Sequence, residues 1–270
     1  LYFNIQKDVE TAYREFEAGN IDVATIPTSR IAEAVQKYGE AEDGYTITPG
    51  HQCVLGAQVS TYYIVVNNQD PVMKDLNLRK AISLAINRQA ICDVLFDGTR
   101  FPADNIVPPG IAGYQEGVWK YAKYDQAAAL ELLDQYYPAD SNGDRGLNNV
   151  VLSCNSGGGH EDVMASIQAD LSAVGIQAVI ETTEWAAYLD KLENGDYQFG
   201  RLGWNADYPI MDNFLFPLFY TGNADNRSQY SNPAVDEAMM KARTTVNDEE
   251  RIKLLQDVNA MISEDMPVIP

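Results

Sequence analysis

The side chains best suited to hold a small ligand lie close together, between residues 201 and 208. Arg201 supplies a cation, Trp204 a flat apolar face and Asp207 an anion, and Asn205 and Tyr208 add polar groups beside them. A cation and an anion can hold a small zwitterion through charge-assisted hydrogen bonds, while an indole ring packs against its apolar part. The spacing therefore predicts a ligand-binding loop.

Nothing in the sequence selects catalysis. A hydrolase needs a positioned nucleophile and base, but the chain has neither a Gly-x-Ser-x-Gly nor a His-Glu-x-x-His motif, and its only histidines are His51 and His160. A carboxylate pair such as Asp207 with Asp212 is the remaining option, for sugar cleavage. We therefore predict a binding protein rather than an enzyme.

Metal and cofactor motifs are also absent from the sequence. The three cysteines, Cys53, Cys92 and Cys154, are widely spaced and show no CxxC pattern. Residues 140–146 carry oxygen ligands at alternate positions, as a calcium loop does, but position twelve of such a loop is Val151 instead of a bidentate glutamate. A turn is the simpler interpretation, and we expect no metal and no cofactor.

The charge of the chain excludes some partners. Its 270 residues include 39 acidic and 19 basic side chains, which gives a net charge of −20. Nucleic-acid binders need a basic face to displace counterions, and anionic lipid attracts basic segments. We expect neither partner. No apolar run in the sequence is long enough to cross a bilayer.

The elements around the candidate loop follow clear local patterns. A strand over 197–201 leads into it, a helix over 184–193 precedes it, and helices over 233–243 and 248–265 follow it. Upstream, the patterns predict one helix from residue 78 to about 100, a helix after Asp125, a strand at 150–152, a helix around 163–171 and a strand at 176–180. The polar segment 67–71 reads as a linker or hinge.

The first 66 residues alternate between strand-like and helix-like patterns. Strands are expected at 2–5, 21–26, 45–48 and 61–66, and helices at 8–18 and 28–37. This is an α/β rhythm with too few strands for a complete sheet.

Seven segments, in order along the chain, resemble those of one protein family. They occupy residues 16–27, 61–67, 78–88, 107–109, 124–133, 203–209 and 230–236. Each is weak alone, but together the chain resembles the peptide/nickel class, or family 5, of extracytoplasmic solute-binding proteins that serve ABC importers. The resemblance implies an α/β, periplasmic-binding-protein-like class II fold. It implies a partial first lobe over 1–66 and the second ligand-binding lobe over 67–270, as in a C-terminal fragment.

The function that the resemblance implies is transport. Such a protein captures oligopeptides or dipeptides outside the cell membrane, in the periplasm or at the outer face, and delivers them to a membrane permease. We expect a full-length protein that is monomeric and lipid-anchored. The alternatives are another solute (a metal chelate, an opine or a sugar), a peptide sensor of the same fold, and, less favoured, a carboxylate-based hydrolase.

The resemblance also gives roles to the loop residues. Asp207 matches the aspartate that holds the free α-amino group of a peptide, and Arg201 lies where some peptide binders place an arginine that meets the ligand carboxylate. Each has a structural alternative: Asp207 as a cap of the turn before Pro209, Trp204 as a core residue and Arg201 as the partner of a structural acid. We expect two lobes to close on the ligand about hinges near Asn67 and beyond Pro270.

Overall fold

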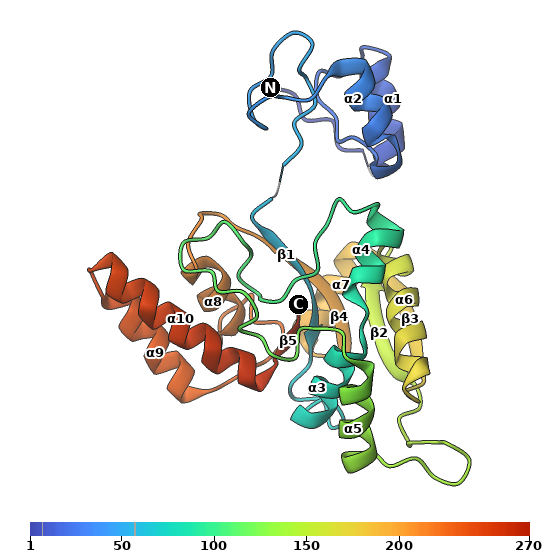
Figure 1. Cartoon of the computed structure of the whole chain (residues 1–270), viewed down its shortest axis with the longest axis vertical. Coiled ribbons are helices and arrows are strands. Elements are labelled where there is room, and N and C mark those ends of the chain that lie inside the picture. The colour runs from blue at the N-terminus through green and yellow to red at the C-terminus, as the bar shows by residue number, and fades with distance from the viewer. Residues whose placement is uncertain (7, 57) are drawn as a thin grey trace. The chain divides into compact units, whose positions relative to one another are not determined.

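A computed structural model describes residues 1–6, 8–56 and 58–270 of the chain. These residues fold as two compact units, which are described separately below (Figure 1). The first unit comprises Leu1–Gln58 and Cys92–Phe101, and the second comprises Val59–Ile91 and Pro102–Pro270. The lobe boundary expected after residue 66 stays a prediction.

The first unit is built on two short helices, α1 (Val9–Glu17) and α2 (Ile31–Tyr38), with a 3-10 turn, η1 (Thr28–Arg30), before the second. Its small core consists of Tyr13, Ala34 and Cys53. Arg30 lies over the ring of Tyr13, 4.6 Å from its centroid. Both helices were expected from the sequence, and both are confirmed.

The strands predicted at 2–5, 21–26 and 45–48 are wrong. Within the described part of this unit, the only ladder-type pairs are isolated bridges, Glu40 with Cys53 and Thr48 with His51. A strand satisfies its backbone groups through a neighbouring strand, and the alternating side chains of these segments do not supply one.

The second unit is built on a five-stranded sheet with the order β3-β2-β4-β1-β5. Its strands are β1 (Ser60–Val66), β2 (Val150–Asn155), β3 (Ala178–Thr183), β4 (Phe199–Asn205) and β5 (Val268–Ile269). β2 runs parallel to β3 and β4, whereas β1 runs antiparallel to both β4 and β5. The first strand of the unit therefore lies beside its last.

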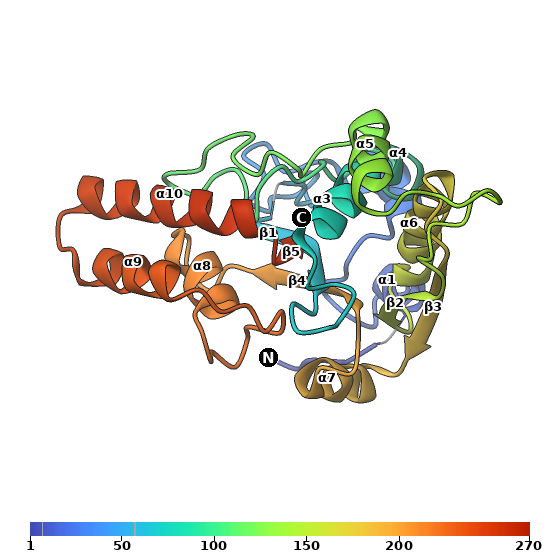
Figure 2. The same cartoon turned by 90° about the horizontal axis from the view of Figure 1, so that it is seen from below.

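Helices surround this sheet. α6 (His160–Ala173) packs against β2 and β3, and α3 (Leu76–Ala85) packs mainly against α5 (Gln126–Tyr136). α7 (Trp185–Asn194) contacts β2. α4 (Arg88–Phe96) follows α3 along the chain, and its residues from Cys92 on belong to the first unit. α8 (Asp212–Phe219), α9 (Pro233–Thr244) and α10 (Asp248–Asp265) form a separate helical group, in which α9 and α10 lie side by side (Figure 2). Within the described residues, no helix has both the length and the apolar composition of a bilayer span.

Capping residues explain why several helices begin where they were expected. The carboxylate of Asp125 accepts a hydrogen bond from the Ala128 amide at the start of α5. The Asn247 side chain does the same for the Glu250 amide at the start of α10. Such caps satisfy amides that have no partner inside the helix, so they set the first residue of the helix.

The structure differs from the expectations in three further places. The helix expected from residue 78 to about 100 is two helices, α3 and α4, because the chain leaves the helical conformation at Ile86. α8 was not expected. Residues 67–71 form a turn rather than a free linker: Asn67 is 5% exposed, and its Nδ2 donates to the carbonyls of Gly195 and Tyr197.

Two buried arginines tie the end of the chain to α3 and α4. Arg79 donates to the carbonyls of Asp265 and Met266, at the end of α10, and to those of Met73 and Lys74, just before α3. Arg88 donates to the carbonyls of Pro270 and Ser83. Burial lowers the pKa of Arg88 to about 10. Both guanidinium groups therefore bind backbone carbonyls in the interior, and these bonds hold β5 beside β1.

We predict that Arg79→Met lowers the free energy of unfolding by about 3 kcal/mol or more, because it leaves four carbonyls without their donor. Chemical denaturation at neutral pH measures this change. The control is Lys253→Met, at an exposed i,i+4 pair with Asp257, which we expect to cost less than about 0.5 kcal/mol. Equal stability of the two variants would contradict the role given to Arg79.

Candidate functional site

Strand β4 carries the candidate residues and fixes the face on which each one lies. Side chains alternate between the two faces of a strand, so Arg201 and Trp204, three positions apart, point to opposite faces. Gly200 lies against α7, since a Cβ there would meet Leu192 and the Tyr188 hydroxyl at 2.7 Å. Arg201 therefore points to the face of β4 opposite the side chains of Leu192 and Tyr188. The predicted residues form two groups on two faces of β4 instead of one compact pocket.

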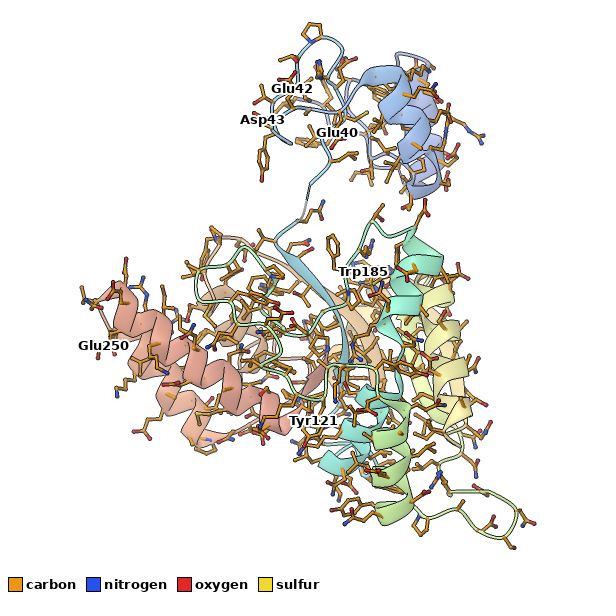
Figure 3. All side chains as sticks on the ribbon, in the orientation of Figure 1. Glu40, Glu42, Asp43, Tyr121, Trp185 and Glu250 are labelled. Atoms are coloured by element: carbon orange, nitrogen blue, oxygen red, sulfur yellow. The ribbon has the colours of Figure 1, made fainter. Side chains whose placement is uncertain are left out.

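Arg201 belongs to the first group, which includes three aromatic side chains from other elements. Its Nη2 contacts Nε2 of His160, the first residue of α6. Its guanidinium lies 5.8 Å from the ring centroid of Tyr62 on β1 and 5.6 Å from that of Trp185. Trp185, labelled in Figure 3, begins α7 and is 46% exposed. An arginine only donates, so Nε2 of His160 is the acceptor in this contact.

The positive charge of Arg201 is not neutralised by an acid. The ion pairs among the described residues join other side chains, and Arg201 Nε is buried without a hydrogen-bond partner. Aromatic faces attract a cation without cancelling its charge. The structural alternative for this residue, a salt bridge to one of the many acids, is therefore not what the structure shows.

The second group is centred on Asn213, in the first turn of α8. Its Oδ1 accepts hydrogen bonds from Trp204 Nε1 at 3.2 Å and from the Asp207 backbone amide at 3.0 Å. Its Nδ2 donates to Asp207 Oδ2 at 3.3 Å. Trp204 is half-buried, whereas Asp207 is exposed. Asn213 thus connects the two predicted ligand residues of this loop.

The other two predicted contacts, Asn205 and Tyr208, are exposed. Asn205 ends β4 opposite Ser60, and Ile210 forms an isolated bridge with Ala112. The loop after residue 107 therefore lies beside the loop that carries Asp207 and Tyr208. Both side chains are open to solvent and available to a ligand.

The carboxylate pair considered for sugar cleavage is not arranged for that chemistry. Asp212 is 8% exposed and pairs with Arg243, whose Nη1 is 3.4 Å from Asp212 Oδ2. Burial raises the pKa of Asp212, while the cations of Arg243 and Arg251 lower it. Asp207 instead faces solvent and is bonded to Asn213. The two carboxylates have separate partners and separate environments.

The remaining candidate sites offer no alternative chemistry. Across the described ranges, no group of three or more His, Cys, Asp or Glu side chains is arranged to hold a metal ion, and the cysteines are free thiols. The Asp140 carboxylate accepts hydrogen bonds from the amides of Asn142 and Asp144, as in an ordinary turn.

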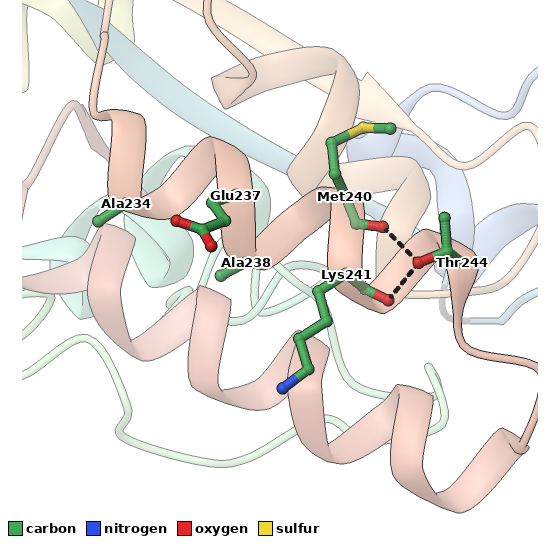
Figure 4. A pocket seen from close by; sticks show the side chains of 6 residues that line it. All are labelled: Ala234, Glu237, Ala238, Met240, Lys241 and Thr244. Atoms are coloured by element: carbon green, nitrogen blue, oxygen red, sulfur yellow. Dashed lines mark hydrogen bonds between the residues drawn. The ribbon is translucent and has the colours of Figure 1, made fainter.

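An open groove of about 600 Å³ lies along α9 (Figure 4). None of the predicted ligand residues lines it; its lining consists of Ala234, Glu237, Ala238, Met240, Lys241 and Thr244.

The sequence did not identify four residues of these groups. Tyr62, His160 and Trp185 join Arg201 from β1, α6 and α7, and no spacing along the chain connects them. Asn213 lies inside the segment first selected for its chemistry, but an amide in the first turn of an unexpected helix gives no local signal. Its 2% exposure, unusual for a polar side chain, became visible only in the folded structure.

Tyr188 supports the backbone of the site from the α7 side. Its hydroxyl lies 2.8 Å from the carbonyl oxygen of Arg201 and 3.2 Å from that of Ser153, which connects α7 to both β4 and β2. Burial strongly raises the pKa of this phenol, with a small opposing effect from the Arg201 cation. The neutral hydroxyl is therefore the form that the fold holds.

Comparison with known proteins gives consistent matches over nearly the whole chain. A sequence model for "Bacterial extracellular solute-binding proteins, family 5 Middle" matches residues 1–226. Oligopeptide-binding protein OppA of Bacillus subtilis (strain 168) is 25% identical over 263 residues, covering 96% of this chain and 47% of OppA. Heme-binding protein A of Haemophilus influenzae is 26% identical over 273 residues, covering 100% of this chain and 48% of that protein.

A solved structure agrees with these matches. The ABC transporter-associated periplasmic binding protein DppA from Helicobacter pylori, in complex with the peptide STSA, has a TM-score of 0.79 at 25% identity. The match covers 97% of this chain and 49% of that one. The chain spans about half the length of the curated relatives it matches.

We predict that Tyr188→Phe lowers the free energy of unfolding by about 1–2 kcal/mol at pH 7, because the buried carbonyls of Arg201 and Ser153 lose the one hydroxyl donor that they share. The folded protein holds the Tyr188 proton more tightly than the unfolded chain does, so this contribution is complete below about pH 10 and is lost as the pH rises further. Denaturant unfolding at pH 7 and above pH 10 measures both effects, and the variant should show a weaker alkaline loss. Tyr136→Phe, at an exposed tyrosine, is the control; identical behaviour of both variants would contradict the prediction.

Proposed function

Because this chain belongs to family 5 of the bacterial extracellular solute-binding proteins, we propose that it forms the ligand-binding part of an ABC importer that captures short peptides outside the cell membrane. Its fold is the α/β, periplasmic-binding-protein-like fold of that family. The relatives named for oligopeptide binding, and the peptide complex of the similar DppA structure, support a peptide as the ligand.

The observation that carries this proposal is the state of the Asp207 carboxylate. It is exposed, and the hydrogen bond described for it comes from a neutral amide, Asn213 Nδ2. The carboxylate therefore forms no ion pair with another described residue and has an open side. A protonated peptide amine there forms a charge-assisted hydrogen bond, which is about twice as strong as a neutral one. Closure of a second lobe over this contact removes water and strengthens it further.

Arg201 is proposed to bind the peptide carboxylate. It has the opposite charge, its Nε is buried without a hydrogen-bond partner, and its guanidinium lies 5.8 Å from the ring centroid of Tyr62 and 5.6 Å from that of Trp185. A guanidinium group matches a carboxylate in a bidentate geometry, so Arg201 is suited to this role. Trp204 offers a half-buried ring beside the amine site, and Asn205 and Tyr208 offer exposed polar groups at the rim.

The remaining parts of the proposal concern the whole protein. We propose delivery of the peptide to a membrane permease, a monomeric full-length protein, and attachment to the membrane through a lipid anchor. The division into a partial first lobe over 1–66 and a second lobe over 67–270 belongs to the same proposal. In this arrangement β1 and β5, neighbours in the sheet, are the segments from which the chain passes between the lobes.

We predict that Asp207→Asn in the full-length protein weakens binding of a peptide with a free amine by about tenfold or more, the loss expected for a charge-assisted hydrogen bond. Isothermal titration calorimetry measures the affinity. N-acetylation of the peptide should cost a similar amount and should add little to the substitution, because both remove the same contact. Asp257→Asn, an exposed acid on α10, is the matched control and should leave the affinity unchanged.

The result that contradicts the amine assignment is an affinity that neither Asp207→Asn nor N-acetylation alters. Binding of a haem instead of a peptide by the unmodified protein, in the same calorimeter, would replace the proposed ligand with one that the name of a relative suggests.

We predict a parallel effect at the other charge. Arg201→Met should weaken binding of a peptide with a free carboxylate by about tenfold or more, and should have little effect on the affinity for the same peptide with a C-terminal amide. Competition binding with the two peptides measures the difference. Equal losses for both peptides would show that Arg201 supports the fold instead of the ligand carboxylate.

A further inference from the structure

Asn213 is the residue on which the loop around Asp207 converges. It is 2% exposed. Burial of an amide costs free energy unless each of its polar atoms has a hydrogen-bond partner. Its neighbours on α8, Phe214 and Leu215, are fully buried. The Asn213 backbone amide donates to the Ile210 carbonyl at 3.1 Å. The amide group is thus carried by a rigid, packed part of the helix.

The hydrogen bonds fix which way the amide faces. The Trp204 indole and the Asp207 backbone amide are pure donors, so the Asn213 atom that meets both must be the carbonyl oxygen. Both lone pairs of that oxygen are then used. The NH₂ group consequently faces the Asp207 carboxylate and donates to its Oδ2.

We propose that Asn213 is a positioning residue, which sets the orientation of the Asp207 carboxylate and of the Trp204 ring before a ligand arrives. This inference rests on the proposed function. One oxygen of Asp207 is held by Asn213, so the other is directed to the ligand amine. The same amide fixes the loop backbone at Asp207 and the indole ring beside it. A site held in its binding geometry loses less conformational freedom on binding, which increases affinity.

An amide is the side chain that this position requires. Aspartate keeps an acceptor for the indole and for the backbone amide, but it has no donor for Asp207 and places a second negative charge against it. Leucine has the same branched shape at Cγ and forms none of the three bonds. These two substitutions therefore separate loss of the carboxylate orientation from loss of the whole loop anchor.

The chain contains a closely matched control. Asn259 on α10 is 0% exposed, accepts a hydrogen bond from Trp119 Nε1 at 2.9 Å and donates to Asn105 Oδ1 at 3.1 Å. It is a second buried asparagine that holds a tryptophan, and its partners do not include Asp207. Asn259→Leu therefore reproduces the loss of a buried Asn–Trp contact without altering the loop.

The experiment compares Asn213→Leu, Asn213→Asp and Asn259→Leu in the full-length protein. The first readout needs no ligand: the indole Nε1–H signal of Trp204 in ¹⁵N-labelled protein, assigned with Trp204→Phe. The second is the affinity for one peptide with a free amine and for its N-acetylated form. We expect Asn213→Leu to shift the indole signal, to speed its hydrogen exchange, and to weaken binding of the free-amine peptide about tenfold, with a smaller loss for the acetylated one.

Asn213→Asp should keep the Trp204 signal near its original position, because the acceptor remains. Two adjacent carboxylates share a proton, which raises the pKa of the pair. The affinity of this variant for the free-amine peptide should therefore decrease between about pH 7 and about pH 5, whereas that of the unmodified protein should change little. Asn259→Leu should lower thermal stability and leave the affinity within about twofold.

The inference and the proposed function fail in different ways. If Asp207→Asn weakens binding while Asn213→Leu alters neither the Trp204 signal nor the affinity, the positioning role is overturned and the amine site stands. If Asn213→Leu alters the Trp204 signal while Asp207→Asn has no effect on affinity, Asn213 holds the loop as inferred, and the amine assignment is wrong. If Asn213→Leu and Asn259→Leu weaken binding equally, both act through stability, and the inference is overturned.

Discussion

The pairing of β4 with β1 on one side and β2 on the other determines the direction of the candidate ligand side chains that lie on this strand. Because these ladders fix the register, Arg201 must lie opposite Ile64, and Trp204 opposite Thr61. The strand then directs the cation toward α6 and the indole toward α8. A slip of one residue would exchange the two faces and separate each side chain from its partners. The chemistry of the site is thus a consequence of strand register.

Charge is used differently inside the second unit and at the edge where we propose that the ligand binds. In the interior, Arg79 and Arg88 bind backbone carbonyls and so hold the end of the chain beside β1. At the edge, Arg201 contacts an imidazole and aromatic rings, and Asp207 is bonded to an amide. Neither side chain forms an ion pair with another described residue. The two charges belong to two separate groups of side chains, so each one offers its own contact to a ligand.

Much of the fold could be predicted from local patterns. The helices with side-chain caps, such as α5 after Asp125 and α10 after Asn247, begin where the sequence places them, because the capping bonds involve residues two or three positions apart. Four of the five strands of the second unit were also predicted, and the short β5 was not. The strands expected within residues 1–48 were not, since alternation describes a side-chain pattern, while a strand also needs a neighbour to receive its backbone hydrogen bonds.

The sequence by itself determined the types of the candidate ligand residues, their order along one segment and the resemblance of that segment to one family. Only the tertiary structure decided their partners. His160 lies 41 positions from Arg201 along the chain, and Tyr62 is 98 positions from His160. Asn213 lies six positions from Asp207, yet a helix start that no pattern marked brings them together. Such contacts depend on how strands and helices pack across the sheet, and local sequence carries no record of that packing.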